Sequence, residues 1–312
     1  MTQLHRSTGR FGLGLGLAAT TTFLWATLPI ALKVVLLKLD SASIIAVRFA
    51  ISAAILAAVL RASGRLPRFA DLAERRWVLL AVATVFLAAN YHSYMLGLDW
   101  TTAANAQVLI QLAPLLLALG GIFVFREHFN RVQWSGLAVL AGGLALFSWD
   151  QVGAFVDELD RYLAGSAMII VAAATWAVYG MAQKQLLLWW PSPSIMLCLY
   201  AGCALLFAPW TDFAAVARLD PMTLGALLYC SLNTLVAYGC FAESLAHWEA
   251  SRVSAVLALT PLTTLVLVWV TAQVAPAWIE PEHLGWGSLA GAGLVVVGSV
   301  LVSLGQRPQS SA

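Results

Sequence analysis

The sequence predicts an all-α integral membrane protein whose ten transmembrane helices form two inverted five-helix repeats. The 312-residue chain is 61% hydrophobic and 10% charged, with a mean hydropathy of +0.84, whereas soluble domains carry about a quarter charged residues. Its apolar residues form stretches long enough to cross a bilayer as helices. The pattern of the first half returns in the second. Because each half has an odd number of spans, the second copy must be inverted.

The ten predicted spans follow one another along almost the whole chain. Each is an apolar stretch of roughly 20 residues, the length that crosses the hydrocarbon core at about 1.5 Å per residue. Since most connections are short, consecutive spans should pack as antiparallel neighbours. The predicted spans are residues 11–32, 42–60, 77–97, 102–125, 132–149, 164–184, 193–210, 222–245, 252–274 and 286–305.

The two halves match at three places in the same order. Trp25 matches Trp176, Tyr91 and Pro114 match Tyr238 and Pro261, and Glu127 matches Glu282. The spacing between matched residues drifts only in loops. The connection at 150–163 joins the halves, so we place the first repeat at residues 1–155. The second repeat, with a short cytoplasmic tail, occupies residues 156–312.

Lys and Arg are divided unequally between the two sides of the predicted bundle. Twelve of the 17 fall on the side of the N-terminus, four fall on the other side, and Arg48 lies inside a span. Because short cytoplasmic loops carry the excess of positive charge, we expect both termini to be cytoplasmic. The first apolar stretch runs into Lys33 without a convincing cleavage site, which predicts a retained span and not a signal peptide.

A polar run in the third span is the first candidate for the functional site. Polar side chains are costly at bilayer depth, so those found there are functional candidates. Tyr91 has its match in Tyr238, whereas His92 is matched only by Gly239. We interpret Tyr91, His92 and Tyr238 as cavity-lining residues. The alternative is that they form hydrogen bonds to neighbouring helices and hold the bundle together.

The fourth span adds amides and a proline. Gln107, Gln111 and Pro114 are spaced by four and three residues, which would place them on one face of a continuous helix. Pro114 and Pro261 each remove a backbone hydrogen bond and permit bending, so both are predicted hinge or gating residues. Bent helices at matching positions of two halves indicate a transporter site. The alternative for the two glutamines is helix association.

Two tryptophans form a matched pair well inside their spans. Trp25 and Trp176 could each offer a flat apolar wall and one N–H donor, which suits the side chain of an amino acid. Trp176 and Tyr179 are three residues apart and share a helix face. The alternative is that the tryptophans anchor their helices at the membrane interface, although such anchors lie near helix ends.

The ionisable residues inside the membrane are few. Arg48, matched by Leu199, could bind a substrate carboxylate or could hold helices through Asn side chains and backbone carbonyls. Catalytic and nucleotide motifs are absent, and the cysteines have no zinc-like spacing, so we expect no enzyme activity, cofactor, metal or nucleic-acid partner.

These residues carry a family resemblance that covers nearly the whole chain. Two five-span repeats, each with an early Trp, resemble the EamA-type transporters of the drug/metabolite transporter superfamily. The stretch from Gly97 to Ala104 that leads to Pro114 is also similar to that family, as are Arg126-Glu127 and Glu282. Within it, Asn90-Tyr91-His92 and Trp176 look most like the aromatic amino-acid exporter branch.

The resemblance implies ten helices around a central cavity, alternating access, and spans five and ten packed outside. It also implies that Tyr91, His92 and Trp176 contact substrate. Two departures are an insertion before Glu282 and a first span without a carboxylate. We therefore expect a monomeric exporter of aromatic and other neutral amino acids in the inner membrane. The alternatives are a transporter of another small metabolite or drug, an intramembrane enzyme, or a membrane scaffold.

Overall fold

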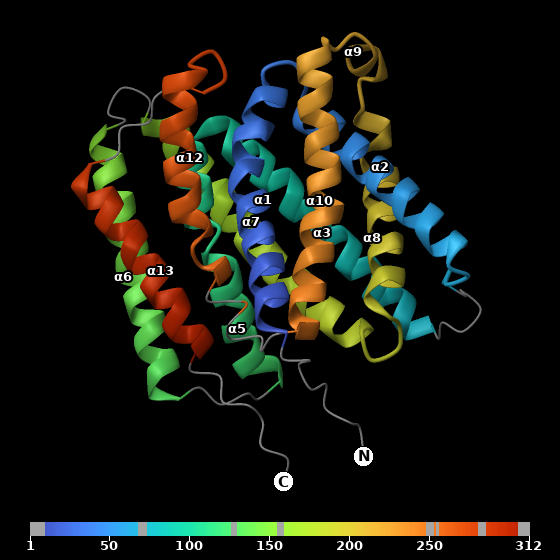
Figure 1. Cartoon of the computed structure of the whole chain (residues 1–312), viewed down its shortest axis with the longest axis horizontal. Helices are drawn as coiled ribbons and strands as arrows, with labels where there is room; N and C mark the ends of the chain where they lie inside the picture. The colour runs from blue at the N-terminus through green and yellow to red at the C-terminus, as the bar shows by residue number, and fades with distance from the viewer. Residues whose placement is uncertain are drawn as a thin grey trace.

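A computed structural model describes residues 10–67, 74–125, 130–154, 159–247, 253, 256–279 and 285–304, and every regular element in these ranges is helical (Figure 1). The helices are α1 (Phe11–Leu36), α2 (Ser41–Ala62), α3 (Glu74–Trp100), α4 (Ala103–Leu109), α5 (Leu112–Phe125), α6 (Arg131–Ala154), α7 (Leu159–Leu186), α8 (Ser192–Phe207), η3 (Ala208–Trp210), α9 (Phe213–Ala217), α10 (Pro221–His247), α12 (Thr260–Val274) and α13 (Trp286–Leu304).

Seven of the described helices are long and apolar enough to cross a membrane. They are α1, α2, α3, α6, α7, α8 and α10, and α12 and α13 are shorter apolar helices. The predicted all-helical fold is therefore confirmed. The count of ten spans stays a prediction, because the fourth predicted span is divided into α4 and α5 and the ninth falls partly outside the described residues.

Polar caps fix where several helices begin, all at the end of the bundle opposite to the start of α1. The Asp40 carboxylate accepts a hydrogen bond from the Ser43 N–H at 2.9 Å before α2, and the Thr102 hydroxyl accepts one from the Asn105 N–H at 3.0 Å before α4. Asp220 accepts from the N–H and the hydroxyl of Thr223, and these bonds lower the pKa of Asp220. Such caps satisfy N–H groups that have no partner inside the helix.

The helices pack in pairs drawn from the two halves of the chain. α3 packs along α7, α1 along α10, α2 along α8 and α6 along α13. The Asn90 side chain donates to the Ala172 carbonyl at 2.8 Å between α3 and α7, and the Thr21 hydroxyl donates to the Ala237 carbonyl at 3.3 Å between α1 and α10. Each core helix is therefore held by a partner that is remote in sequence.

The α6–α13 pair forms one edge of the bundle (Figure 1). A Cβ atom added at Gly143 would lie 2.7 Å from the carbonyl oxygen of Gly291, and Gly136 meets Gly298 in the same way. Only glycine permits backbones to approach this closely. At one end of the pair the Asp150 carboxylate accepts hydrogen bonds from the N–H and hydroxyl of Ser288 at 2.9 and 2.6 Å, which caps α13 from a neighbouring helix.

Two helices are interrupted at matched positions, each just ahead of a proline. α4 ends at Leu109, the chain turns at residues 110–111, and Pro114 is the third residue of α5. Likewise, the chain turns at 258–259 and Pro261 lies in the first turn of α12. Proline is tolerated there because the N–H that it lacks would have no intrahelical partner. The span predicted over residues 102–125 is therefore divided between Gln107 and Pro114, and the shared face of Gln107, Gln111 and Pro114 stays a prediction.

Candidate functional site

The candidate site is an aromatic cluster at mid-bundle, built by helices from both halves of the chain. It lies where α1, α2, α3, α7, α8 and α10 meet. We define the aromatic cluster as Trp25, Phe49, Tyr91, Trp176, Tyr179, Tyr200 and Tyr238.

Tyr91 on α3 contacts members of the aromatic cluster on two other helices. Its ring centroid lies 4.5 Å from that of Phe49 on α2, and its hydroxyl shares side-chain hydrogen bonding with Tyr238 and Thr234 on α10. Phe49 in turn lies 5.5 Å from Tyr200 on α8. One tyrosine therefore joins three helices, so its orientation is fixed by packing on one side and by hydrogen bonds on the other.

The two tryptophans flank Tyr238. The Trp25 ring on α1 makes an edge-on contact with Tyr238 at 5.5 Å, and Trp176 on α7 takes part in a side-chain hydrogen bond with Tyr238. Trp176 also contacts Tyr179 edge-on at 6.3 Å. The structure thus brings together five residues that the sequence pointed to, from four different helices.

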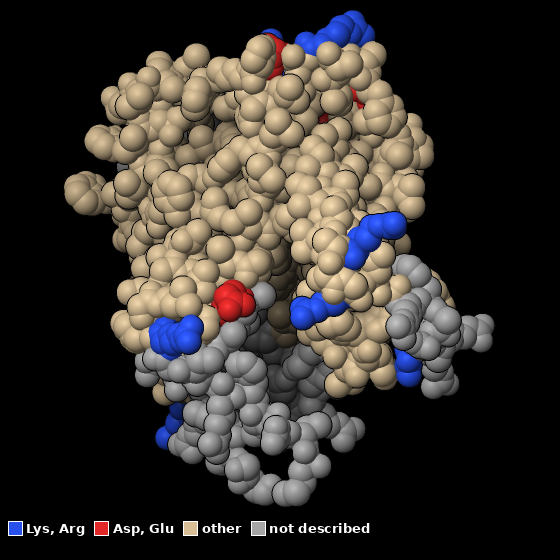
Figure 2. Space-filling view, turned by 45° about the vertical axis from the view of Figure 1, so that its right-hand side comes forward, with Lys and Arg blue, Asp and Glu red and all other residues tan. Residues whose placement is uncertain are grey.

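The aromatic cluster has four half-buried members, which we call the aromatic wall, and three buried members behind them. Trp25, Tyr91, Trp176 and Tyr238 are half-buried, although Tyr91 and Tyr238 lie deep among protein atoms. Behind them Phe49, Tyr179 and Tyr200 are buried, and the Tyr179 hydroxyl donates to the Met196 sulfur at 3.7 Å. Figure 2 shows that the bundle is hollowed in its lower half, toward the end where α1 begins.

Arg48 on α2 stands against the aromatic cluster and is only 2% exposed. Its guanidinium lies over the Tyr91 ring, 5.3 Å from the centroid, and one terminal nitrogen donates to the Thr234 hydroxyl at 2.9 Å. Its Nε has no hydrogen-bond partner. Among the described residues no carboxylate pairs with this charge.

His92 contacts a different part of the bundle from its neighbour Tyr91. The Nδ1 atom of His92 is 3.4 Å from the Ser41 hydroxyl, and the ring stacks beside Phe207 at 5.8 Å, so His92 sits between the start of α2 and the end of α8. Gln107 is buried near the end of α4, and Gln111 lies in the turn before α5. Successive helical residues point about 100° apart, which separates His92 from Tyr91.

Sequence reasoning missed three side chains that complete the site. Phe49 and Tyr200 look like ordinary core residues in their apolar spans, although they occupy matched positions in the two halves. Thr234 could have been found, because it follows Asn233 near the middle of its span and polar groups at that depth are rare.

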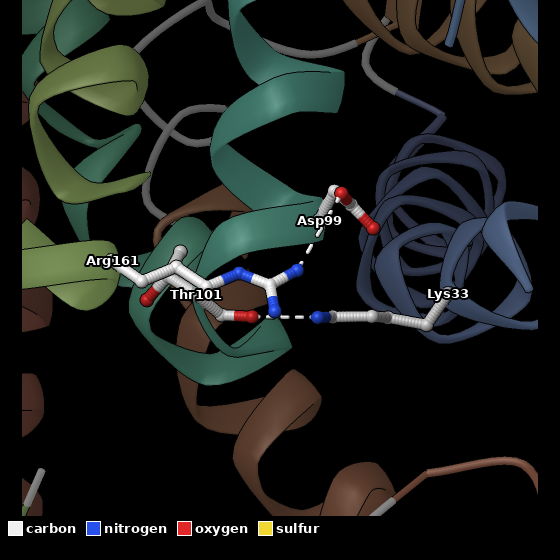
Figure 3. A network of polar contacts seen from close by, with 4 residues as sticks. All are labelled: Lys33, Asp99, Thr101 and Arg161. Carbon is white, nitrogen blue, oxygen red and sulfur yellow. Dashed lines mark hydrogen bonds and ion pairs between the residues drawn. The ribbon is translucent and has the colours of Figure 1, made fainter. Parts of the chain in front are cut away.

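A second polar network closes the bundle at the end opposite to the hollow. The Lys33 ammonium at the end of α1 donates to the Thr101 carbonyl at 2.6 Å, and Arg161 at the start of α7 lies 3.8 Å from Asp99 at the end of α3 (Figure 3). We call these four residues the end latch. Buried Asn105 donates to Thr101 and Ser166 beside it at 2.8 Å. The end latch therefore ties α1, α3 and α7 together.

Groups of three or more metal-binding side chains are not found within the described part of the chain. Glu243 pairs with His247 one turn further along α10 at 3.2 Å. Glu127 and Glu282, which carried part of the family resemblance, lie outside the described residues. Arg48 and the aromatic cluster therefore define the candidate site.

Comparisons with known proteins identify the class of this chain. The model of the EamA-like transporter family matches residues 12–149 and 163–304. An uncharacterized transporter of Haemophilus influenzae is 35% identical over 95% of this chain and 96% of its own length, and the Escherichia coli uncharacterized inner membrane transporter YhbE is 34% identical over 95% and 92%.

Two more distant matches add to this. A probable amino-acid metabolite efflux pump of Salmonella typhimurium is 24% identical over 67% of this chain and 70% of that protein. A solved crystal structure superimposes with a TM-score of 0.61 at 18% identity, covering 95% of this chain and 97% of the other, which supports the fold. The chain therefore belongs to the EamA-like transporter family and is a multi-pass membrane transporter.

Proposed function

We propose that this protein exports amino acids, aromatic and other neutral ones, and related small metabolites by alternating access. The observation that carries the proposal is the half-buried aromatic wall of Trp25, Tyr91, Trp176 and Tyr238 at mid-bundle. Flat apolar rings with a few hydroxyl and N–H groups suit a solute that has an apolar side chain and a polar head. The described match to a probable amino-acid metabolite efflux pump agrees with this substrate class.

The packing pattern supports ten spans in two inverted repeats. Exchanging the halves turns the α1–α10 pair into the α7–α3 pair, and it maps α2–α8 and α6–α13 onto themselves. In the same exchange Asn90 corresponds to Ala237 and Ala172 to Thr21, so the two interhelical hydrogen bonds occupy equivalent places. Two bundles related in this way can rock about a central site. The breaks before Pro114 and Pro261 would let the helices of both halves bend.

The charge distribution supports an orientation with both termini in the cytoplasm of a cell with an inner membrane. The end where α1 begins also holds Arg61, Arg76 and Arg131, at the end of α2 and the starts of α3 and α6. This end would be cytoplasmic by the excess of positive charge. The hollow in Figure 2 lies toward this end, so the structure would correspond to an inward-facing carrier whose outer side is closed by the end latch. The relative YhbE is described as an inner membrane transporter.

Transport into proteoliposomes tests the proposal. Purified protein is reconstituted, and the uptake of labelled phenylalanine, leucine and further amino acids is measured with and without a pH gradient. We expect flux above that of empty liposomes for the aromatic and neutral members. Uptake that equals the empty-liposome rate for every amino acid would refute the substrate class, and uptake of a drug or another metabolite instead would favour the alternative transporter. An uptake rate that is the same with and without the pH gradient would argue against proton coupling.

A matched pair of tryptophan variants locates the site. Trp176 belongs to the aromatic wall, whereas Trp149 on α6 is 83% exposed. Trp176→Ala removes a wall of the proposed cavity, so we expect flux to fall about tenfold or more, since the contacts of one buried aromatic group are commonly worth more than 1.4 kcal/mol. Trp149→Ala should leave flux unchanged. Equal flux in both variants would argue for a scaffold or for a site elsewhere.

A further inference from the structure

Arg48 is a buried cation whose surroundings satisfy it only in part. Its guanidinium donates to the Thr234 hydroxyl at 2.9 Å and lies over the Tyr91 ring, while its Nε has no partner. A guanidinium has five N–H donors and no acceptor. A buried charge is costly unless it is paired and hydrogen-bonded, and in the ranges that the structure describes no Asp or Glu contacts it.

Packing does not explain this residue. The matching position in the second half is Leu199, which is fully buried on α8. The neighbouring residues Phe49 and Tyr200 also match one another, and their rings meet at 5.5 Å. A leucine therefore fills the equivalent place beside the same kind of aromatic contact, so the scaffold does not require a cation on α2.

The guanidinium of Arg48, whose Nε lacks a partner, adjoins Tyr91 of the half-buried wall. Tyr91 borders the guanidinium through the ring contact and shares hydrogen bonding with Tyr238, and both tyrosines keep accessible surface. A carboxylate that replaced part of the Tyr91 contact would meet the guanidinium directly. The planar guanidinium can bind a carboxylate through two parallel hydrogen bonds.

We propose that Arg48 binds the carboxylate of the transported solute, so that a carboxylate head is the common feature of the substrates. The proposal rests on the proposed function and specifies its substrate class. A single cation fits one carboxylate better than a phosphate, which usually has several Lys or Arg partners. The aromatic wall receives the apolar part of the solute, and Thr234 holds the guanidinium in place. The α-ammonium of an amino acid is not needed for binding at this site.

Four related ligands, in two pairs of a carboxylate and its amide, separate the contributions of carboxylate and ammonium. Phenylalanine has both groups, phenylalaninamide lacks the carboxylate, 3-phenylpropionate lacks the ammonium, and 3-phenylpropionamide lacks both. A ligand that binds only the native state raises its apparent stability by an amount that grows with the logarithm of ligand concentration divided by Kd. The thermal unfolding of the purified protein is therefore followed against the concentration of each ligand. We expect both carboxylates to bind about tenfold or more tightly than their amides.

Variants assign this preference to Arg48. Arg48→Gln should abolish the difference between each carboxylate and its amide, and Arg48→Lys should retain part of it because a point charge replaces the planar fork. Thr234→Val removes the hydroxyl that positions the guanidinium and should reduce the difference. Arg218→Gln is the matched control, since Arg218 is exposed and donates to the Ala214 carbonyl on its own short helix. This control should behave as the wild type.

The outcomes decide the proposal without transport data. Wild-type protein that binds carboxylates and amides equally, or that binds no carboxylate, would overturn it, and so would an Arg48→Gln variant that keeps the preference. If Arg48→Gln does not fold, the wild-type ligand comparison and Thr234→Val still give the answer. Failure of the proposed function is a different result: carboxylates bind the protein selectively, but no amino acid crosses the proteoliposome membrane.

Discussion

The close contact between α6 and α13 gives a stability prediction whose size follows from the structure. In Gly143→Ala the new Cβ would lie 2.7 Å from both the Gly291 oxygen and the Val295 nitrogen. Both are backbone atoms, so relief requires the helices to separate by roughly 0.7 Å to reach ordinary contact distance. Overpacking of this kind costs about 1–3 kcal/mol. Gly142, the adjacent residue, has no atom within 4 Å of its added Cβ and serves as the control.

Comparison of the two variants isolates the steric cost. Both gain the same helix propensity, about 0.5–1 kcal/mol for glycine to alanine, so Gly142→Ala should be neutral or slightly stabilised. We expect the free energy of unfolding of Gly143→Ala, measured by denaturant titration in detergent with tryptophan fluorescence, to lie about 1–3 kcal/mol below that of Gly142→Ala. Gly291→Ala against Gly293→Ala repeats the comparison from the other helix. Equal stability within each pair would refute the close approach of α6 and α13.

Three further predictions concern the ends of the bundle. Lys33→Met should lower the free energy of unfolding by about 1.5–3 kcal/mol, because the hydrogen bond from the ammonium to Thr101 is charge-assisted and partly buried. Asp99→Asn should lower it by no more than about 1 kcal/mol, because the side chains of the Arg161–Asp99 ion pair are 60% and 42% exposed. If Asp99→Asn lowered the melting temperature more than Lys33→Met did, the ion pair would be the stronger interaction of the end latch. Asp150→Ala should lower the free energy of unfolding by about 1–2 kcal/mol through loss of the cap on α13. Asp150→Asn should lie between Asp150→Ala and the wild type, and an unchanged melting temperature in Asp150→Ala would contradict the capping role. The hydrogen bonds from Thr223 lower the pKa of Asp220 in the folded state. The stability that ionised Asp220 contributes is therefore fully present above the ordinary Asp pKa of about 3.9, and it is lost as the pH falls through the lowered pKa. The difference in melting temperature between wild type and Asp220→Asn should therefore shrink below pH 4, and a difference that grows on acidification would reverse the assigned sign.

The sequence could predict the helices because the bilayer sets their length. An apolar stretch must span about 30 Å, so α1, α2, α3, α6, α7, α8 and α10 begin and end within a few residues of the predicted spans. The interruption before α5 was only partly predictable. Pro114 indicates local weakness, but a proline fits the first turn of a new helix, and the break therefore lies ahead of it at residues 110–111.

Part of the candidate site was predictable because the two halves agree there. Trp25, Tyr91, Trp176 and Tyr238 could be selected because matched positions in repeated spans share an environment, and the structure brings these four together. His92 is adjacent to Tyr91 in sequence but points toward Ser41 and Phe207. Its direction depends on the rotation of α3 against α2 and α8, which spacing alone does not give.

The contacts of Arg48 show what lay beyond sequence reasoning and why it matters for transport. Its partners Tyr91 and Thr234 come from α3 and α10, so their proximity depends on which helices pack together. Its guanidinium is already only 2% exposed and has no carboxylate partner among the described residues, which is a costly arrangement. A carboxylate bound by Arg48 would neutralise that charge, so the loaded protein could close around its cargo more readily than the empty one. A ligand shifts a conformational equilibrium only through its differential affinity for the two states. Arg48 would supply that difference at the position where the two halves of the chain are unlike.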